Sequence, residues 1–284
     1  MSEGPHSARN RPANPAEALA WAADALRAQR LDVAERLAEG VLKADRGNTA
    51  AAQLLGQALL LQGRAADAIA PLSRAAKRSG DPALETLLAR ALAETDRRDE
   101  AAATLRQAIA RRPAYPLAFV ELGDLLGKLG RSDEALAVFE DGLAQAPDAA
   151  ILRLALGHLC LARNERARAR ALFAEVRAAA PQRLDARLAL AGVLVLDGDY
   201  PAAAALYREA LALRPDDAAM QIALGRCLLE MGEREAGESV LRAAARGGAW
   251  MAGEAIAALA ATPHGRFFLR PSDAARFLDV TPAR

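Results

Sequence analysis

The feature that most constrains this chain is a pattern of residues that returns every 34 positions. In one copy the recurring residues are Leu122, Gly123, Gly130, Ala135, Phe139 and Pro147. In the next copy the same positions hold Leu156, Gly157, Asn164, Ala169, Phe173 and Pro181. Seven copies can be followed, beginning near residues 15, 49, 82, 116, 150, 184 and 218, and one step is 33 residues rather than 34. Such a period is typical of repeat proteins, whose units pack against their neighbours.

Each copy contains the residues of two helices joined by a short turn. The first helix carries Leu beside a small residue, such as Gly123, which allows a second helix to approach closely. A residue that tolerates the left-handed conformation, such as Gly130, then ends the first helix. Pro147 and its equivalents in other copies end the second helix. Because a single hairpin cannot bury both of its apolar faces, the copies are expected to stack.

Composition agrees with a helical fold. The chain is 52% hydrophobic but only 4% aromatic. Ala and Leu, the main apolar residues, favour helices, whereas large sheets need β-branched and aromatic residues. The charges balance at 37 Lys and Arg against 36 Asp and Glu, so no global field attracts nucleic acid or a membrane surface. No run of about 20 apolar residues is free of charge, and we therefore expect no membrane insertion.

The repeat resembles the tetratricopeptide repeat, which has a small residue at position 8, Ala at position 20, an aromatic residue or Leu at position 24 and Pro at position 32. The resemblance covers residues 15–251. It departs from the family where Arg46 and Gly80 replace Pro and where Gly237 replaces Ala, and the aromatic residue of the first helix survives only as Phe119. The resemblance implies an all-α fold, an α-solenoid of stacked helix–turn–helix hairpins that forms a right-handed superhelix.

The sequence divides into three parts. Residues 1–14 are polar, contain Pro, Asn, Gly and Ser, and are predicted to be disordered. Residues 15–262 hold the seven repeats and a capping helix at 252–261. Residues 263–284 match no repeat and form an aromatic tail with Phe267, Phe268 and Phe277. Ser272 is a good N-cap for a short helix over 272–279.

Three interpretations of this tail remain open. Its apolar side chains, which also include Leu269 and Leu278, favour contact with the surface around Trp250, Ile256 and Leu259. The tail then acts as a structural lid on the last repeat and the capping helix. In the second interpretation it reaches into the groove and competes with a partner. In the third it is a free docking motif.

The resemblance also implies a binding groove, because the family lines its concave face with positions 2, 5, 9, 12 and 13 of the first helices. In copies four to seven the apolar residues at positions 5 and 12 are Val120, Leu154, Leu161, Leu188, Val195, Ile222 and Leu229. Polar residues of the predicted groove are Arg90, Asp124, Lys128, His158 and Arg226. If these apolar side chains are exposed together, they form a large patch, which in a soluble protein marks an interaction site. The Lys, Asn and Arg clamp with which some members hold chaperone C-termini is absent. Alternatively, some of the apolar residues pack in the core and the polar ones form ordinary surface pairs, such as Arg90 with Glu94.

No constellation of catalytic or metal-ligating residues is apparent. The three histidines lie in no metal-binding frame, and Cys160 and Cys227 are 67 residues apart, which favours two small core residues. The stretch from Gly123 to Lys128 lacks the spacing and the Ser or Thr of a phosphate loop. A cluster of arginines is either a solvated helix face or a surface for an acidic partner or RNA: Arg153, Arg163, Arg166, Arg168, Arg170 and Arg187. The balanced charge and the lack of neighbouring aromatic residues favour the solvated face.

We therefore expect a non-catalytic scaffold or adaptor, without a cofactor, that binds a helix or peptide of another protein in the apolar groove. An alternative is an accessory subunit that presents a peptide or protein substrate to a separate enzyme. Nucleic acid is not an expected partner, and the sequence leaves the oligomeric state open. The polar start of the chain indicates the cytoplasm, and the excess of Arg over its three Lys indicates a bacterial source.

Overall fold

The computed structural model describes residues 14–268 and 270–279, which contain helices and no strand. The helices are α1 (Pro15–Arg27), α2 (Leu31–Ala44), α3 (Thr49–Leu61), α4 (Ala65–Ser79), α5 (Pro82–Glu94), α6 (Arg98–Ile109), α7 (Pro116–Lys128), α8 (Ser132–Gln145), α9 (Ala150–Ala162), α10 (Arg166–Ala179), α11 (Leu184–Leu196), α12 (Tyr200–Leu213), α13 (Ala218–Glu230), α14 (Arg234–Ala245), α15 (Ala249–Ala261) and α16 (Pro271–Leu278). The first fourteen helices form the seven predicted hairpins. The all-α solenoid expected from the repeat is therefore confirmed.

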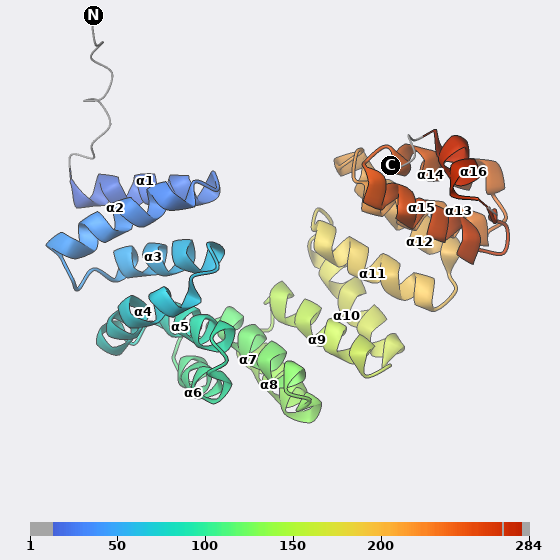
Figure 1. Cartoon of the computed structure of the whole chain (residues 1–284). Coiled ribbons are helices and arrows are strands. Elements are labelled where there is room, and N and C mark those ends of the chain that lie inside the picture. The colour runs from blue at the N-terminus through green and yellow to red at the C-terminus, as the bar shows by residue number, and fades with distance from the viewer. Residues whose placement is uncertain (1–13, 269, 280–284) are drawn as a thin grey trace, which may run out of the picture. The chain divides into compact units, whose positions relative to one another are not determined.

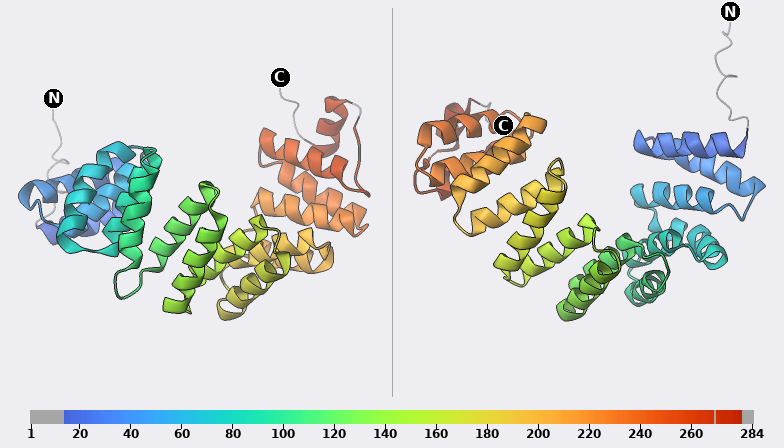
Figure 2. Two further views of the ribbon diagram at one scale, coloured as in Figure 1. Left: turned by 90° about the horizontal axis from the view of Figure 1, so that it is seen from below. Right: turned by 180° about the vertical axis from the view of Figure 1, so that it is seen from behind.

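The chain forms two compact units, which we describe separately. Unit 1 runs to Ala155 and unit 2 starts at Leu156, so the boundary falls within α9. In each unit the hairpins stack in chain order, as Figure 1 and the further views of Figure 2 show. Within each unit most helices pack mainly against the next one along the chain, and first helices of adjacent hairpins, such as α3 and α5, also meet.

Small residues at position 8 hold the two helices of a hairpin close together. A Cβ atom on Gly56 of α3 would lie 2.6 Å from Leu72 of α4, and one on Gly225 of α13 would lie 2.7 Å from Leu241 of α14. Both leucines are fully buried. The expected close approach of the second helix is confirmed, and it leaves no room for a side chain at these positions.

The turn between the two helices of each hairpin also follows the sequence prediction. The residues with positive φ at these turns are Gln29, Gly63, Asp96, Gly130, Asn164, Gly198 and Gly232. Gly accepts this conformation without strain, and Asn and Asp tolerate it. Every first helix from α1 to α13 therefore ends in the same way, and each hairpin closes with the same geometry.

Residues after the seventh hairpin form an end cap on unit 2. α15 begins at Ala249, three residues before the capping helix that the sequence predicts. α16 corresponds to the helix expected over 272–279, but its N-cap is Arg270 and Pro271 is its first residue, so the prediction that Ser272 is the N-cap is wrong. α16 lies against α14 and α15, the place that the lid interpretation gives to the tail. Leu278 is fully buried there, with Leu259 and Leu241 in the same apolar cluster.

Aromatic and charged groups attach this cap to α14. The rings of Phe268 and Phe277 lie 5.3 Å apart, and the guanidinium groups of Arg242 and Arg266 lie 4.2 and 4.8 Å from the Phe277 ring. Arg242 Nε also donates to the carbonyl oxygen of Phe277 over 3.1 Å. Arg266 Nε donates to Oε1 of the buried Glu238 over 2.6 Å.

At the ends of the described chain, three residues differ from the sequence prediction. The sequence predicts that Phe267 and Trp250 take part in the cap. Both side chains are instead exposed, Phe267 at 78% and Trp250 at 70%. The cap is already filled by Phe268, Phe277 and Leu278. Asn14, placed in the disordered segment by the sequence, instead accepts a hydrogen bond from the Glu17 backbone N–H and starts α1. Residues 1–13 and Leu269 lie outside the described residues.

Candidate protein-binding surface

A cavity of about 270 Å³ lies among the first helices of unit 1. Its walls come from α1, α3, α5 and the start of α7. Most lining residues occupy positions 2, 5, 9, 12 or 13 of their copies, the positions that the resemblance assigns to a groove. These residues are Leu26, Gln53, Gln57, Leu60, Leu61, Ala83, Thr86, Arg90 and Leu117, and Leu87 and Tyr115 complete the wall.

The cavity combines exposed apolar and polar groups. Leu61 is 55% exposed, whereas Leu60 beside it is buried. Gln53 and Gln57 offer side-chain amides, each of which can both donate and accept hydrogen bonds. The hydroxyl of Thr86 is already used, because it donates to the Pro82 carbonyl oxygen over 2.6 Å.

Arg90 supplies the charge at one side of this cavity. Its Nε atom lies 3.6 Å from Oε1 of Glu121, and the arginine side chain is 41% exposed. Burial raises the pKa of Glu121 above its ordinary value, and the positive charge of Arg90 acts in the opposite direction. Burial also raises the pKa of Tyr115, which therefore keeps its hydroxyl proton at neutral pH. This part of the surface can bind both anionic and hydrogen-bonding groups.

The predicted groove residues of unit 1 lie in different environments. Arg90 lines the cavity. Val120 is half-buried on α7, and Asp124 and Lys128 are exposed on the same helix. Leu154, in contrast, is only 7% exposed and belongs to the core. The prediction that Leu154 presents its side chain on the surface is therefore wrong.

In unit 2 two further groove residues are buried. Leu229 is fully buried and Ile222 is 9% exposed, and both pack in the cluster that contains the end cap. α15 lies against α13 and covers these positions, as another first helix of the array would. The prediction that Leu229 and Ile222 present their side chains on the surface is therefore also wrong.

The remaining predicted residues of unit 2 do not form one large cavity. His158 is exposed, with its ring 5.1 Å from that of Phe173. Leu161, Leu188 and Val195 are half-buried. Val195 and Arg226 line a cavity of about 90 Å³ between α11, α12 and α13.

This small cavity of unit 2 also contains a thiol. The Cys227 side chain lies in its wall. Burial raises the pKa of the Cys227 thiol to about 11, so the thiol stays neutral at pH 7 and is a poor nucleophile.

The predicted groove and the larger first-helix cavity fall in different copies. Sequence reasoning favoured copies four to seven because their positions 5 and 12 are apolar, whereas the larger first-helix cavity lies in copies one to four. The same position rule applied to the earlier copies points to Gln53, Leu60 and Leu61. Tyr115 was missed because it precedes its first helix and lies at none of the five positions.

The arginine cluster is engaged in local contacts. Arg166 Nη1 donates to the Leu196 carbonyl oxygen over 2.8 Å. Arg163 pairs with Glu165 at 2.7 Å, and Arg170 lies 3.7 Å from Asp197. These pairs agree with the solvated helix face. In the part of the chain that the structure describes, no group of His, Cys, Asp and Glu side chains could hold a metal ion. None of its helices is long and apolar enough to cross a membrane.

The stacked hairpins and the lining positions define an α-solenoid repeat protein. Tetratricopeptide-repeat family models match residues 86–150, 120–184, 154–218 and 194–248. The chain belongs to the tetratricopeptide-repeat family, whose repeats generally mediate protein–protein interaction. A family model described as anaphase-promoting complex, cyclosome, subunit 3 matches residues 27–108.

Solved structures share this fold at low sequence identity. A thermophilic tetratricopeptide-repeat protein of Thermus thermophilus is 24% identical with a TM-score of 0.56, over 64% of this chain and 100% of that one. A tetratricopeptide-repeat protein of Parabacteroides merdae is 16% identical with a TM-score of 0.58, over 85% and 97%. The human IFIT1 dimer with PPP-AAAA is 16% identical with a TM-score of 0.64, over 89% and 64%. No curated protein gives a significant match.

Proposed function

We propose that this protein is a non-catalytic scaffold that binds a segment of another protein in the first-helix cavity of unit 1. The observation that carries the proposal is the cavity itself, lined at the positions through which the family's first helices bind partners. The lining suits a peptide. Leu26 and Leu61 can cover an apolar side chain, and the amides of Gln53 and Gln57 can bond to a peptide backbone.

The proposal replaces the continuous apolar groove of copies four to seven. Three of the seven apolar residues of that groove are buried and unavailable to a ligand. Arg90 is the one predicted site residue that lies in the larger first-helix cavity. An accessory subunit that presents a substrate to a separate enzyme would use the same cavity. The two functions differ in whether the bound protein is an enzyme's substrate.

The test pairs two leucines of matched exposure. Leu61 lines the cavity and is 55% exposed, whereas Leu213 of α12 lies outside the cavity and is 57% exposed. Replacement of either by Glu leaves the new charge in water, so both variants should fold. A partner is first identified by affinity purification and mass spectrometry and is then purified. We expect Leu61→Glu and Arg90→Ala each to weaken its binding at least about tenfold, or about 1.4 kcal/mol.

Leu213→Glu should leave the affinity unchanged. Equal affinity of all variants and the parent chain, measured by calorimetry with the purified partner, would refute the placement of the site. Circular dichroism of each variant checks that the helices remain.

A further inference from the structure

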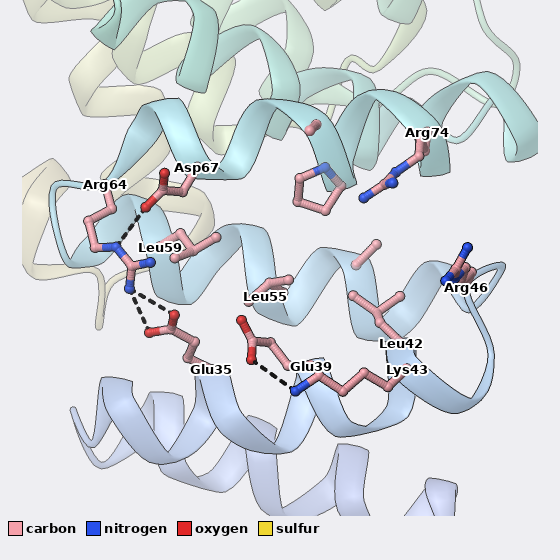
Figure 3. A pocket seen from close by; sticks show the side chains of 13 residues that line it. Glu35, Glu39, Leu42, Lys43, Arg46, Leu55, Leu59, Arg64, Asp67 and Arg74 are labelled. Atoms are coloured by element: carbon pink, nitrogen blue, oxygen red, sulfur yellow. Dashed lines mark hydrogen bonds and ion pairs between the residues drawn. The ribbon is translucent and has the colours of Figure 1, made fainter.

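A second and larger cavity lies on the other side of α3, between the second helices α2 and α4 (Figure 3). Its volume is about 640 Å³, within the range of about 300–1,000 Å³ found for ligand pockets. α3 contributes Ala52, Leu55 and Leu59 to this cavity, whereas Gln53 and Gln57 of the same helix line the first one. Residues three or four apart share a helix face, so the two sets lie on different faces of α3.

Hollows between second helices recur along the array, because a cavity of about 400 Å³ lies between α4 and α6 with Glu85 at position 4 of its copy. In the larger hollow between α2 and α4, position 4 holds a small residue. This residue is Ala52 in the second copy, and its methyl group leaves the space between α2 and α4 open. In the fourth copy the same position holds Phe119, which is fully buried and packs against Gly142 of α8. The chain therefore fills this position with an aromatic ring in one copy and leaves a solvent-accessible hollow in another.

The floor of the hollow is apolar. Figure 3 shows Leu42, Leu55 and Leu59 between the two second helices, and Pro71 of α4 also lines the hollow. Leu55 and Leu59 are 6% and 3% exposed, so they form a fixed base.

At one end of the hollow, one arginine pairs with two carboxylates. Arg64 donates to Glu35 Oε1 over 2.7 Å and to Asp67 Oδ2 over 2.8 Å. Hydrogen bonds from Gln62 and Arg64 hold the pKa of Glu35 below its ordinary value, so the carboxylate stays charged and paired at neutral pH. Because Glu35 and Asp67 share the single guanidinium group of Arg64, this end keeps a net negative charge and does not attract an anionic ligand.

The other end carries unbalanced positive charge. Arg46 and Arg74 lie there, at the opposite side of the view in Figure 3 from Arg64. Among the described residues neither arginine has a carboxylate within 4.0 Å. The nearby Lys43 pairs with Glu39, with Nζ 3.9 Å from Oε2. Two unpaired guanidinium groups at the end of an apolar hollow are complementary to carboxylates.

The hollow is long rather than round. Its lining residues on α2 extend from Glu35 to Lys43, about 12 Å along the helix, and Arg46 lies in the turn that follows α2. An extended peptide covers the helical part of this length with about four residues. An elongated shape with an apolar floor and one cationic end suits a peptide segment.

We propose that this hollow is a second docking site, which binds an extended acidic segment of a partner protein with an apolar side chain on Leu55 and Leu59 and carboxylates at Arg46 and Arg74. The site does not depend on the first-helix cavity, because it uses the other face of α3.

The experiment is an NMR titration of the full chain with ¹³C-labelled Leu and Ala methyl groups. The probe is an acetylated peptide, Gly-Phe-Gly-Glu-Glu. Matched peptides replace the two Glu by Lys or the Phe by Ala. We expect the acidic Phe peptide to shift the methyl signals of Ala52, Leu42, Leu55 and Leu59. The Lys peptide should bind at least about tenfold more weakly, and binding should weaken as salt is added.

Variants of the protein then locate the site. Ala52→Phe, which copies the aromatic residue of the fourth repeat, should abolish the shifts by filling the hollow. Arg46→Glu with Arg74→Glu should weaken binding at least about tenfold, and this exposed pair avoids any failure of Ala52→Phe to fold. Arg106→Glu is the control, because Arg106 is exposed on α6 outside the hollow.

Three results would overturn the proposal: no shift of these methyl groups, equal binding of the Lys peptide, or an effect of Arg106→Glu equal to that of the Arg46→Glu, Arg74→Glu double variant. Leu61→Glu should leave the titration unchanged. A loss of peptide binding in Leu61→Glu would move the peptide to the first-helix cavity and so also refute the second site. The purified partner of the first test binds or fails independently of this result.

Discussion

At the scale of single residues, the buried carboxylate of Glu238 carries the most charge contacts in unit 2. Its side chain is 7% exposed and lies 2.9 Å from Arg234 Nε, 3.4 Å from Arg242 Nη2 and 2.6 Å from Arg266 Nε. Arg266 belongs to the tail, so this one carboxylate connects α14 to the end cap. Burial raises the pKa of Glu238, but hydrogen bonds from Arg266 and Arg234 outweigh burial and hold the pKa below its ordinary value.

This lowered pKa predicts a pH-dependent contribution to stability. The charged carboxylate stabilises the fold at neutral pH, and the contribution is lost as pH falls below about 4.5 and the folded protein takes up the proton. We expect Glu238→Gln to lower the free energy of unfolding at pH 7 by about 1–3 kcal/mol. Urea unfolding at pH 7, 5 and 3.5 measures the effect, which should shrink at the lowest pH.

Glu235→Gln on the same helix is the control, because Glu235 is exposed. It should change stability little at any of these pH values. A loss in Glu238→Gln that is the same at pH 7 and 3.5 would contradict the assigned role of the charge.

At the scale of helices, the glycines inside helices differ in whether a side chain of another helix packs against them. Gly56 of α3 faces Leu72, and a Cβ atom there would lie 2.6–2.9 Å from three of its carbon atoms. Gly40 of α2 has no atom outside its own helix backbone and its chain neighbours within 4 Å of such a Cβ. Both glycines lie inside helices, where Ala is intrinsically favoured by about 1 kcal/mol.

The same substitution is therefore expected to act in opposite directions. Gly56→Ala should destabilise the protein by about 1–3 kcal/mol, because the close-packed hairpin must separate. Gly40→Ala should stabilise it by up to about 1 kcal/mol. Chemical denaturation of both variants measures the two changes. Stabilisation by Gly56→Ala would show that the helices separate at no cost.

At the scale of the whole chain, much of the fold could be predicted because the residues within each repeat are enough to specify its hairpin. Gly123, Gly130 and Ala135 specify one hairpin without reference to distant residues. The candidate site could not be predicted in the same way, because side-chain exposure depends on the neighbouring helix. Leu229 occupies a groove position, yet α15 covers it and His264 Nδ1 lies 3.0 Å from its carbonyl oxygen. The sequence predicts a capping helix after copy seven, but the repeat pattern does not indicate that this helix covers a groove position.

Nearest-neighbour packing also predicts how damage spreads. Leu278 of α16 is fully buried, and Leu278→Ala should cost about 2 kcal/mol, the lower end for such a change, because a terminal helix can relax. Faster amide exchange is expected in α14–α16, with α1–α4 unchanged, since repeats contact only their neighbours. Hydrogen exchange with mass spectrometry measures this pattern. Phe267→Ala is the control, because Phe267 is 78% exposed and should have no effect. Uniform loss of protection along the chain would contradict local packing.

The position of α3 between two cavities has a consequence for how they act together. Ala52, Leu55 and Leu59 form the wall of one cavity, and Gln53, Gln57 and Leu61 form the wall of the other. If an occupant on one side displaces or stiffens this helix, it also changes the free energy of binding on the other side. Thermodynamic linkage makes any such coupling reciprocal, so each occupant then affects the other to the same extent. In this way α3, a helix of thirteen residues, can couple the binding of two chains that do not contact each other.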